Sequence, residues 1–417
     1  MKKRIIATVL SAIIATNGLL ALAGCEKKVS ASTDLMEGVK PRTVGTDAKL
    51  VDSGATALAD FSLRLFGSAF DEEGNILVSP LSALFALGMT ANGTQGETRA
   101  QMEDTFGLTV DELNQYLYVY MKSLPSEEQY KLSMANGIWL NDSADFTANP
   151  DFLQTNADRY GAAIHKAPFD DETKDQINEF VNENTAEMIP SILDDIQPDE
   201  LMYLVNALAF EAEWAKVYEE FNVREGEFTN ADGEQKIVDM MYSQEDLYIE
   251  DEFATGFIKP YVDDKYAFVA LLPNEGISVM DYASSLTGEN LRTLLDNAEA
   301  TTIDTAMPKF KSEYSTLLND SLRDIGIIDL FDGSKADLSE LGTSKTGNLF
   351  VNRVIHKTFI EVDELGTKAG AATVVGIAKA SLPIITHEVY LNRPFLYMLI
   401  DREHNLPLFV GAELFME

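Results

Sequence analysis

The sequence predicts a single large α+β domain, in which helices come first and strands dominate the later part of the chain. The chain has 417 residues, of which 46% are hydrophobic and 24% are charged, so it can bury a sizeable core. Apolar residues recur at helical spacing early in the chain, whereas its last part is mostly short apolar runs typical of strands. No internal repeat, regular strand–helix alternation or second linker divides the chain, so we expect one domain rather than several.

The N-terminus has the pattern of a signal peptide. A basic stretch, residues 1–4, precedes the apolar residues 5–22, and Leu22-Ala23-Gly24-Cys25 closes the segment. This ending resembles the lipobox of bacterial lipoproteins, in which the cysteine carries the acyl chains. An ordinary secretory signal with an incidental cysteine is the alternative. Because Cys25 is the only cysteine, the sequence excludes an internal disulfide, a Cys-rich zinc site and a redox pair.

The charge of the chain limits its partners. With 32 basic and 68 acidic residues the net charge is −36, which argues against binding to nucleic acid or to an anionic membrane surface. We expect membrane contact only through a lipid on Cys25. This places the protein outside the bacterial cytoplasmic membrane, either anchored at the cell surface or secreted after release.

The expected domain organisation follows from these patterns. Residues 1–25 form the lipoprotein signal peptide, which ends at the lipidated cysteine. Residues 26–48 are polar and lack apolar periodicity, which predicts a flexible tether. Residues 49–417 form the folded domain.

The first elements of this domain have local signals. Apolar residues at helical spacing predict a helix over 55–70, and Gly74-Asn75 ends that pattern. Residues 76–78 read as a short buried strand. Ser79-Pro80 then predicts the start of a second helix, because serine caps helices and proline suits their first turn; Asn92-Gly93 ends it.

The later elements are mostly strands. An amphipathic helix is expected over residues 175–188. The expected strands cover residues 134–140, 201–210, 266–272, 354–362, 389–391, 395–401 and 408–414.

The sequence shows no motif of an enzyme. None of the four histidines, His165, His356, His387 and His404, stands at a metal-binding spacing. The chain also lacks a Gly-x-Ser-x-Gly elbow and a glycine-rich phosphate loop. We therefore expect no metal, no cofactor and no catalytic activity, although a site assembled from distant residues would leave no such motif.

One segment differs from its surroundings. Leu365–His387 contains no Asp or Glu and begins with a run of small residues. Counted with period two over residues 367–378, one face holds only small or apolar residues, and Lys368 is the only charge on the other. No proline precedes Pro383, so the segment could join a sheet, yet its glycines and alanines make it a poor permanent strand. We interpret it as a loop in one state and a strand in another; an ordinary Ala/Gly loop is the alternative.

Residues 362–373, Val-Asp-Glu-Leu-Gly-Thr-Lys-Ala-Gly-Ala-Ala-Thr, resemble the hinge of the serpin family, Glu-x-Gly-Thr-Glu-Ala-Ala-Ala-Ala-Thr. Lys368 departs from the usual Glu, at a position that faces solvent in the alternation. Further stretches resemble family motifs in the same order along residues 55–417. They are Asn75–Ser82, Gly93–Thr98, Asn206-Ala207 with Trp214, Pro308-Lys309, His356, Asn392–Phe395 and Pro407–Gly411.

The resemblance implies a serpin fold with three β-sheets, about nine helices and an exposed reactive-centre loop. It implies three groups of site residues. The shutter, a polar network under the central sheet, is Ser79, Asn206 and His356; the breach, where the loop enters, is Trp214, Lys309 and Glu364. The hinge is Glu364, Gly366, Thr367, Lys368, Ala369, Gly370, Ala371 and Ala372.

The resemblance also implies a function, the suicide inhibition of serine proteases by a monomer. Counting seventeen positions from Glu364 places the scissile bond at Ala380-Ser381, which suits elastase-like proteases. Counting sixteen places it at Lys379-Ala380 and favours trypsin-like enzymes. Three alternatives stay open: a non-inhibitory serpin that acts as a binding module, a surface solute-binding lipoprotein, and a hydrolase.

Overall fold

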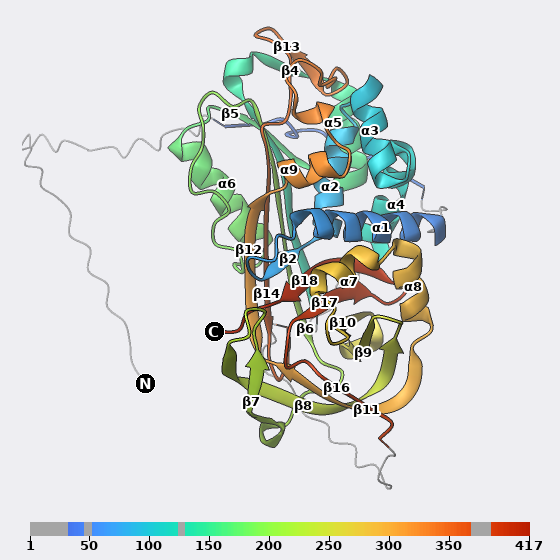
Figure 1. The fold of residues 1–417 in the computed structure, drawn as a ribbon. Coiled ribbons are helices and arrows are strands. Elements are labelled where there is room, and N and C mark those ends of the chain that lie inside the picture. The colour runs from blue at the N-terminus through green and yellow to red at the C-terminus, as the bar shows by residue number, and fades with distance from the viewer. Residues whose placement is uncertain (1–31, 46–51, 124–129, 368–384) are drawn as a thin grey trace, which may run out of the picture. The chain divides into compact units, whose positions relative to one another are not determined.

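The structure is a computed structural model that describes residues 32–45, 52–123, 130–367 and 385–417. The described residues belong to one compact unit, Ser32–Glu417. Within this described part the chain forms nine α-helices and three β-sheets (Figure 1). The expected α+β class, the three sheets and the helix number are therefore confirmed.

The helices lie mostly in the first half of the chain. They are α1 (Asp52–Ala69), α2 (Pro80–Ala91), α3 (Gly96–Phe106), α4 (Val110–Ser123), α5 (Pro150–Tyr160), α6 (Asp171–Asn184), α7 (Val279–Ser285), α8 (Gly288–Asp296) and α9 (Asn319–Asp324).

The strands fall into three sheets. The seven-stranded central sheet has the order β1 (Thr33–Asp34), β5 (Ala163–Ala167), β3 (Tyr130–Asn141), β6 (Met202–Glu213), β15 (Gly366–Thr367), β14 (Arg353–Val362) and β12 (Phe310–Leu317). The nine-stranded sheet contains β16 (His387–Tyr390), β11 (Glu299–Pro308), β8 (Gln235–Glu250), β9 (Ala254–Pro260), β10 (Tyr266–Pro273), β17 (Phe395–Asp401), β18 (Leu406–Glu413), β2 (Ile76–Val78) and β7 (Val223–Thr229). The third sheet is β13 (Gly342–Ser344) with β4 (Phe146–Ala148).

Local capping explains where helix α2 begins. The Ser79 side chain accepts a hydrogen bond from the Ser82 N–H at 3.3 Å, and Pro80 occupies the first turn. Proline is tolerated there because the first N–H groups of a helix have no partner within the helix. The predicted start of this helix is confirmed.

Helix α6 is displaced from its predicted range. The helix expected over 175–188 begins at Asp171 because Asp170 caps it, accepting a hydrogen bond from the Thr173 N–H at 3.0 Å. It ends at Asn184, because Ala186 and Glu187 have positive φ angles of 51° and 63°, which no α-helix contains.

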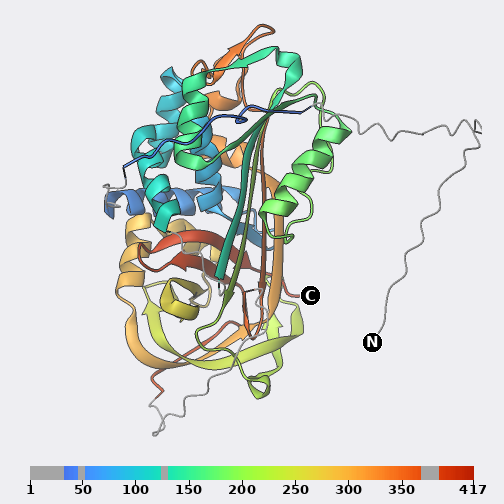
Figure 2. The same ribbon diagram turned by 180° about the vertical axis from the view of Figure 1, so that it is seen from behind.

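Helices cover the central sheet on both faces. Helix α6 lies on one face, whereas α2 and its neighbours lie on the other (Figures 1 and 2). Ile177 and Val181 of α6 are buried in one apolar cluster with side chains of β3, β6 and β14. A much larger core cluster includes the buried residues of α2 together with other residues of the same strands. The central strands are therefore buried on both faces, which explains why β6 is apolar nearly throughout.

Part of the predicted tether contacts the domain. Thr33 and Asp34 pair antiparallel with β5, at the edge of the central sheet. The Arg42 side chain forms an ion pair with Asp158 at 2.8 Å. Residues 32–45, which fall within the tether expected over 26–48, are thus attached to the domain in this structure. Among the described residues, no helix is long and apolar enough to cross a membrane.

Candidate functional site

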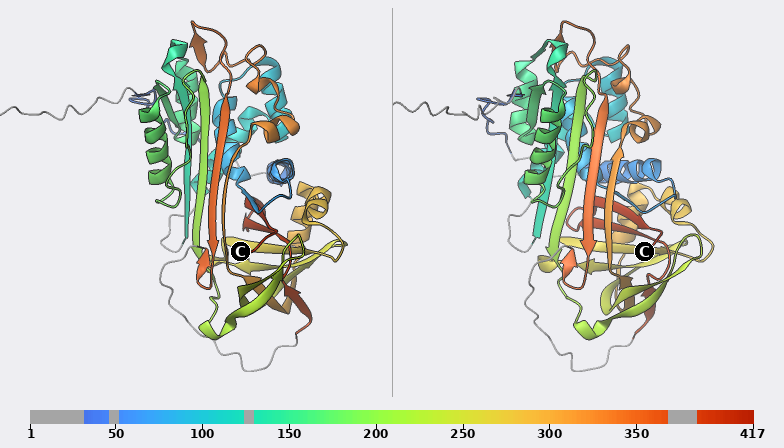
Figure 3. Two further views of the ribbon diagram at one scale, coloured as in Figure 1. Left: turned by 60° about the vertical axis from the view of Figure 1, so that its left-hand side comes forward. Right: turned by 90° about the vertical axis from the view of Figure 1, so that its left-hand side faces the viewer.

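The centre of the seven-stranded sheet contains an unusual junction. Strands β6 and β14 run parallel and pair directly, with Arg353 opposite Tyr203 at one end and Phe359 opposite Ala209 at the other. Beyond Phe359 the short strand β15 lies between them, antiparallel to both (Figure 3). The junction therefore holds two strands side by side along most of its length and three strands at one end. We call it the seam.

Two hinge residues, Gly366 and Thr367, form β15. Gly366 pairs with Glu213, and Thr367 pairs with Ala212 on one side and Val362 on the other. A Cβ atom on Gly366 would lie 2.1 Å from the Ala212 carbonyl oxygen, so only glycine fits this position. The start of the hinge is thus already part of the central sheet.

The three breach residues meet at this end of the seam. Lys309 Nζ lies 2.5 Å from Glu364 Oε2, and the hydrogen bond from Lys309 lowers the pKa of Glu364. The Trp214 indole N–H donates to the Asp363 carbonyl at 2.8 Å, and the Trp214 backbone N–H donates to the Leu365 carbonyl at 2.9 Å. These contacts fix the chain immediately before β15.

Asp363 closes the turn that leads into β15. Its carboxylate accepts hydrogen bonds from the N–H groups of Leu365 at 2.8 Å and Gly366 at 3.1 Å. Burial is the main effect on this carboxyl group and raises its pKa. An aspartate that bonds to the backbone two and three residues ahead stabilises a turn, so the direction in which the chain enters the sheet is set locally.

Residues beyond the predicted breach complete this end of the seam. The Trp214 ring stacks on Tyr261 with ring centres 4.4 Å apart. Lys259, almost fully buried, forms an ion pair with Glu245 at 2.6 Å and lies 4.3 Å from the centre of the Tyr218 ring. Sequence reasoning missed this group. Its only signal was a lysine within the otherwise uncharged strand β9.

The shutter residues are also brought together. Asn136 of β3, Asn206 of β6 and His356 of β14 occupy the same level of three neighbouring strands. Asn206 donates a hydrogen bond to Asn136 at 2.7 Å and accepts one from Ser82 at 2.9 Å. The Ser79 hydroxyl donates to the Leu408 carbonyl at 2.8 Å, which links this level to the nine-stranded sheet. Asn136 and Ser82 were not among the predicted shutter residues.

His356 is held in its neutral form. Its Nε2 accepts a hydrogen bond from the Ser79 N–H at 3.0 Å, so the ring proton lies on Nδ1, which donates to Oδ1 of Asn206. Full burial lowers the pKa of His356 from 6.5 to about 3. A charged imidazole at this place would lose its hydration without gaining a carboxylate partner.

The other predicted site residues cannot be placed. Cys25 lies outside the described residues, and so do the remaining hinge residues Lys368, Ala369, Gly370, Ala371 and Ala372. Lys379, Ala380 and Ser381 of the two candidate scissile bonds lie outside them as well.

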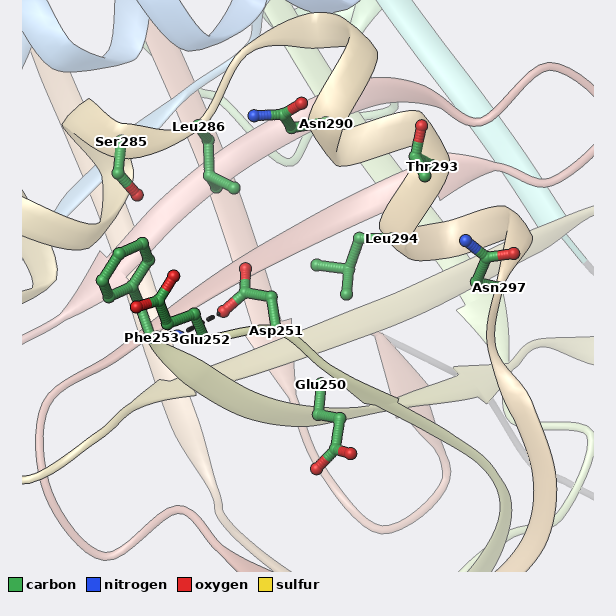
Figure 4. A pocket seen from close by; sticks show the side chains of 10 residues that line it. All are labelled: Glu250, Asp251, Glu252, Phe253, Ser285, Leu286, Asn290, Thr293, Leu294 and Asn297. Carbon is green, nitrogen blue, oxygen red and sulfur yellow. Dashed lines mark hydrogen bonds between the residues drawn. The ribbon is translucent and has the colours of Figure 1, made fainter.

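A groove elsewhere on the domain is lined in part by acidic side chains. It encloses about 320 Å³ between the turn from β8 to β9 and the helices α7 and α8 (Figure 4). Its acidic side chains include Asp251, which already accepts hydrogen bonds from Tyr282 at 3.0 Å and from two backbone N–H groups. The lining residues include neither a histidine nor a cysteine. Within the described ranges, no cluster of three or more potential metal ligands occurs.

Comparison with known proteins identifies the family. The model of a family described as "Serpin (serine protease inhibitor)" matches residues 56–414. The chain belongs to the serpin family. The leukocyte elastase inhibitor of Homo sapiens is 31% identical over 375 residues, which cover 86% of this chain and 98% of that protein. The leukocyte elastase inhibitor of Xenopus laevis is 32% identical over 376 residues, with the same coverage.

Solved serpin structures support the same assignment. The native state of the thermophilic serpin tengpin has a TM-score of 0.89 and 47% identity, over 92% of this chain and all of that chain. Its latent state has a TM-score of 0.79, over 89% of this chain. The described serpin is therefore more similar to the native state than to the latent one.

Proposed function

We propose that this serpin is a suicide inhibitor of serine proteases, cleaved at Ala380-Ser381, and that the loop then inserts into the seam. The observation that carries this proposal is β15, because it places the start of the loop between the two strands that a longer insert would separate. A binding module or a hydrolase would not require a sheet with such a junction.

The proposed reaction begins as ordinary proteolysis. The protease serine oxygen attacks the carbonyl carbon of Ala380, the bond to the Ser381 nitrogen breaks, and that nitrogen leaves with a proton delivered by the protease. The product is an ester between Ala380 and the protease, with a new N-terminus at Ser381. Water has not yet cleaved the ester at this stage, so the protease is covalently attached to the upstream part of the loop.

Insertion then separates the protease from its docking position. A strand of residues 367–380 spans about 45 Å at roughly 3.3 Å per residue. Insertion replaces the seven β6–β14 residue pairs by antiparallel pairings on both sides of the loop, and the loop face from Thr367 to Ile377 holds only small or apolar residues, so it adds no buried charge. The uncleaved form persists because the intact loop is held at both ends, which makes its stability kinetic.

Elastase-like proteases are the proposed targets. Alanine before the scissile bond suits a shallow specificity pocket, and the similar human and frog proteins are named leukocyte elastase inhibitors. Cleavage at Lys379-Ala380 by a trypsin-like protease is the second possibility. The proposal includes a monomer held at the outer side of the cytoplasmic membrane by a lipid on Cys25, or secreted after release.

The test is covalent trapping. The chain without residues 1–25 is mixed with a pancreatic-type elastase and analysed on a denaturing gel. We expect a band at the summed mass that survives boiling, together with a released fragment that begins at Ser381. A fragment that begins at Ala380, with trapping by trypsin, would assign the neighbouring bond.

Two loop variants make this test specific. Ala371→Glu places a charge on the face that would be buried and should convert the protein into a substrate that is cleaved without trapping. Lys368→Glu is the matched control, because it changes a charge on the opposite face and should still trap protease. Complete cleavage of the unmodified protein without a covalent band, by elastase and by trypsin alike, would favour the non-inhibitory serpin.

A further inference from the structure

Two hydroxyl groups meet where the loop enters the sheet. The Tyr261 hydroxyl and the Thr367 hydroxyl lie 2.6 Å apart, and both side chains are completely buried. Tyr261 follows strand β9 of the nine-stranded sheet, whereas Thr367 belongs to β15 of the central sheet. This hydrogen bond therefore joins the start of the loop in the central sheet to the end of a strand in the nine-stranded sheet.

Tyr261 is held rigidly for this contact. One face of its ring stacks on Trp214 at an interplanar angle of 9°, and Phe210 packs against it with ring centres 5.2 Å apart. The Tyr261 N–H donates to the Tyr266 carbonyl at 3.0 Å. Lys259, 5.3 Å from the Trp214 ring centre, supports the stack from within the core. The hydroxyl is thus presented at a fixed position rather than on a side chain free to turn away.

We propose that the Tyr261–Thr367 pair is a latch that keeps the first two loop residues inserted in the resting molecule and thereby sets the rate at which the remainder of the loop enters. Tyr261 is a positioning residue in this scheme, since it touches neither the protease nor the scissile bond. The rate part of the inference rests on the proposed inhibitory function, whereas the latch itself does not.

Burial explains why this bond can act as a latch. If β15 left the sheet, the Thr367 hydroxyl would reach water, but the Tyr261 hydroxyl would lose its partner within the core. Buried hydroxyls without a partner are disfavoured, so the inserted position is preferred. When β15 is already in place, insertion only extends its existing pairings with β6 and β14. If β15 had left the sheet, the first residues of the loop would have to be ordered again before pairing could continue, at a cost in conformational entropy.

Hydrogen exchange tests the latch in the free protein. Tyr261→Phe and Thr367→Val each remove one hydroxyl and keep the shape of the side chain. We expect each variant to raise the opening equilibrium of residues 363–367 roughly three- to tenfold, the range for one net hydrogen bond. The double variant should show no further increase, because either substitution alone breaks the bond. Unchanged exchange, or additive effects of the two substitutions, would overturn the latch.

Two control variants separate the latch from general loosening. Tyr218→Phe removes a buried hydroxyl beside Lys259 that does not contact Thr367, and it should leave exchange at 363–367 unchanged. Thr367→Ser keeps the hydroxyl and should restore most of the protection lost in Thr367→Val. If Tyr218→Phe matched Tyr261→Phe, the effect would reflect core packing and the latch would be rejected.

Stopped-flow fluorescence tests the rate. After mixing with a protease that the unmodified protein traps, the limiting rate of insertion should fall several-fold in Tyr261→Phe and Thr367→Val, with more cleaved, untrapped serpin. If the variants showed raised hydrogen exchange but a normal limiting rate, the claim that the latch sets the insertion rate would be wrong. The hydrogen bond would then only hold β15 in the sheet. If the unmodified protein trapped no protease, the proposed function would fail, while the exchange measurement would still decide whether the latch exists.

Discussion

Acidification below pH 6.5 should destabilise this protein through His356, and the structure gives the size of the effect. The imidazole has a pKa of about 3 in the folded protein, because it is fully buried, against 6.5 as its ordinary value. Between these values the unfolded chain binds a proton that the folded protein excludes, so stability is lost as the pH falls. At pH 5 the loss relative to pH 7.5 is about 2 kcal/mol from this group alone.

The comparison protein is His356→Gln, which can still donate to Asn206 and accept from Ser79 but does not titrate. Urea midpoints measured at pH 7.5 and pH 5 should fall more for the unmodified protein, by a difference of about 2 kcal/mol in unfolding free energy. Other titrating groups contribute equally to the acid sensitivity of the two proteins, so their contributions cancel when the two are compared. One such group is the buried Glu413. Burial raises its pKa, so Glu413 favours the folded state at low pH, whereas His356 disfavours it. Equal acid sensitivity of the two proteins would show that His356 accepts a proton inside the folded sheet and would refute the reasoning.

Three further substitutions give defined expectations. Glu364→Lys places two lysines together in place of the Lys309 ion pair and should release the hinge, producing self-association on size-exclusion chromatography; a monomeric and active variant would contradict this role. Ala371→Glu should retain the melting temperature of the uncleaved protein but lack the gain in melting temperature that follows loop cleavage, which differential scanning calorimetry measures. Lys259→Met leaves Glu245 buried without its partner and should cost about 3–5 kcal/mol, whereas adding Glu245→Gln should recover much of the loss in urea unfolding.

Much of the scaffold could be predicted because its signals are local. Ser79-Pro80 specifies the start of α2, since capping and the fixed φ of proline act within one turn. The strand expected over 354–362 is β14, and the one over 266–272 is β10. Helix α6 was misplaced because its apolar spacing continues to Met188, beyond the residues at which the backbone turns left-handed.

The candidate site was less predictable because it depends on contacts between distant strands. The family resemblance supplied Ser79, Asn206 and His356, but Asn136 joins them only through the register of β3 against β6. Tyr261 contacts Thr367 across 106 positions of sequence and between two sheets. No periodicity within one strand specifies such a contact, so the latch could not be recognised before the fold was known.

The parallel direction of β6 and β14 has a consequence for anything that enters between them. Because both run the same way, an incoming strand that is antiparallel to one is antiparallel to the other, as β15 is. The seam therefore acts as a polarity filter: a segment inserted with the orientation of β15 gains two antiparallel ladders, and a reversed segment gains two parallel ones, which are slightly less stable per residue.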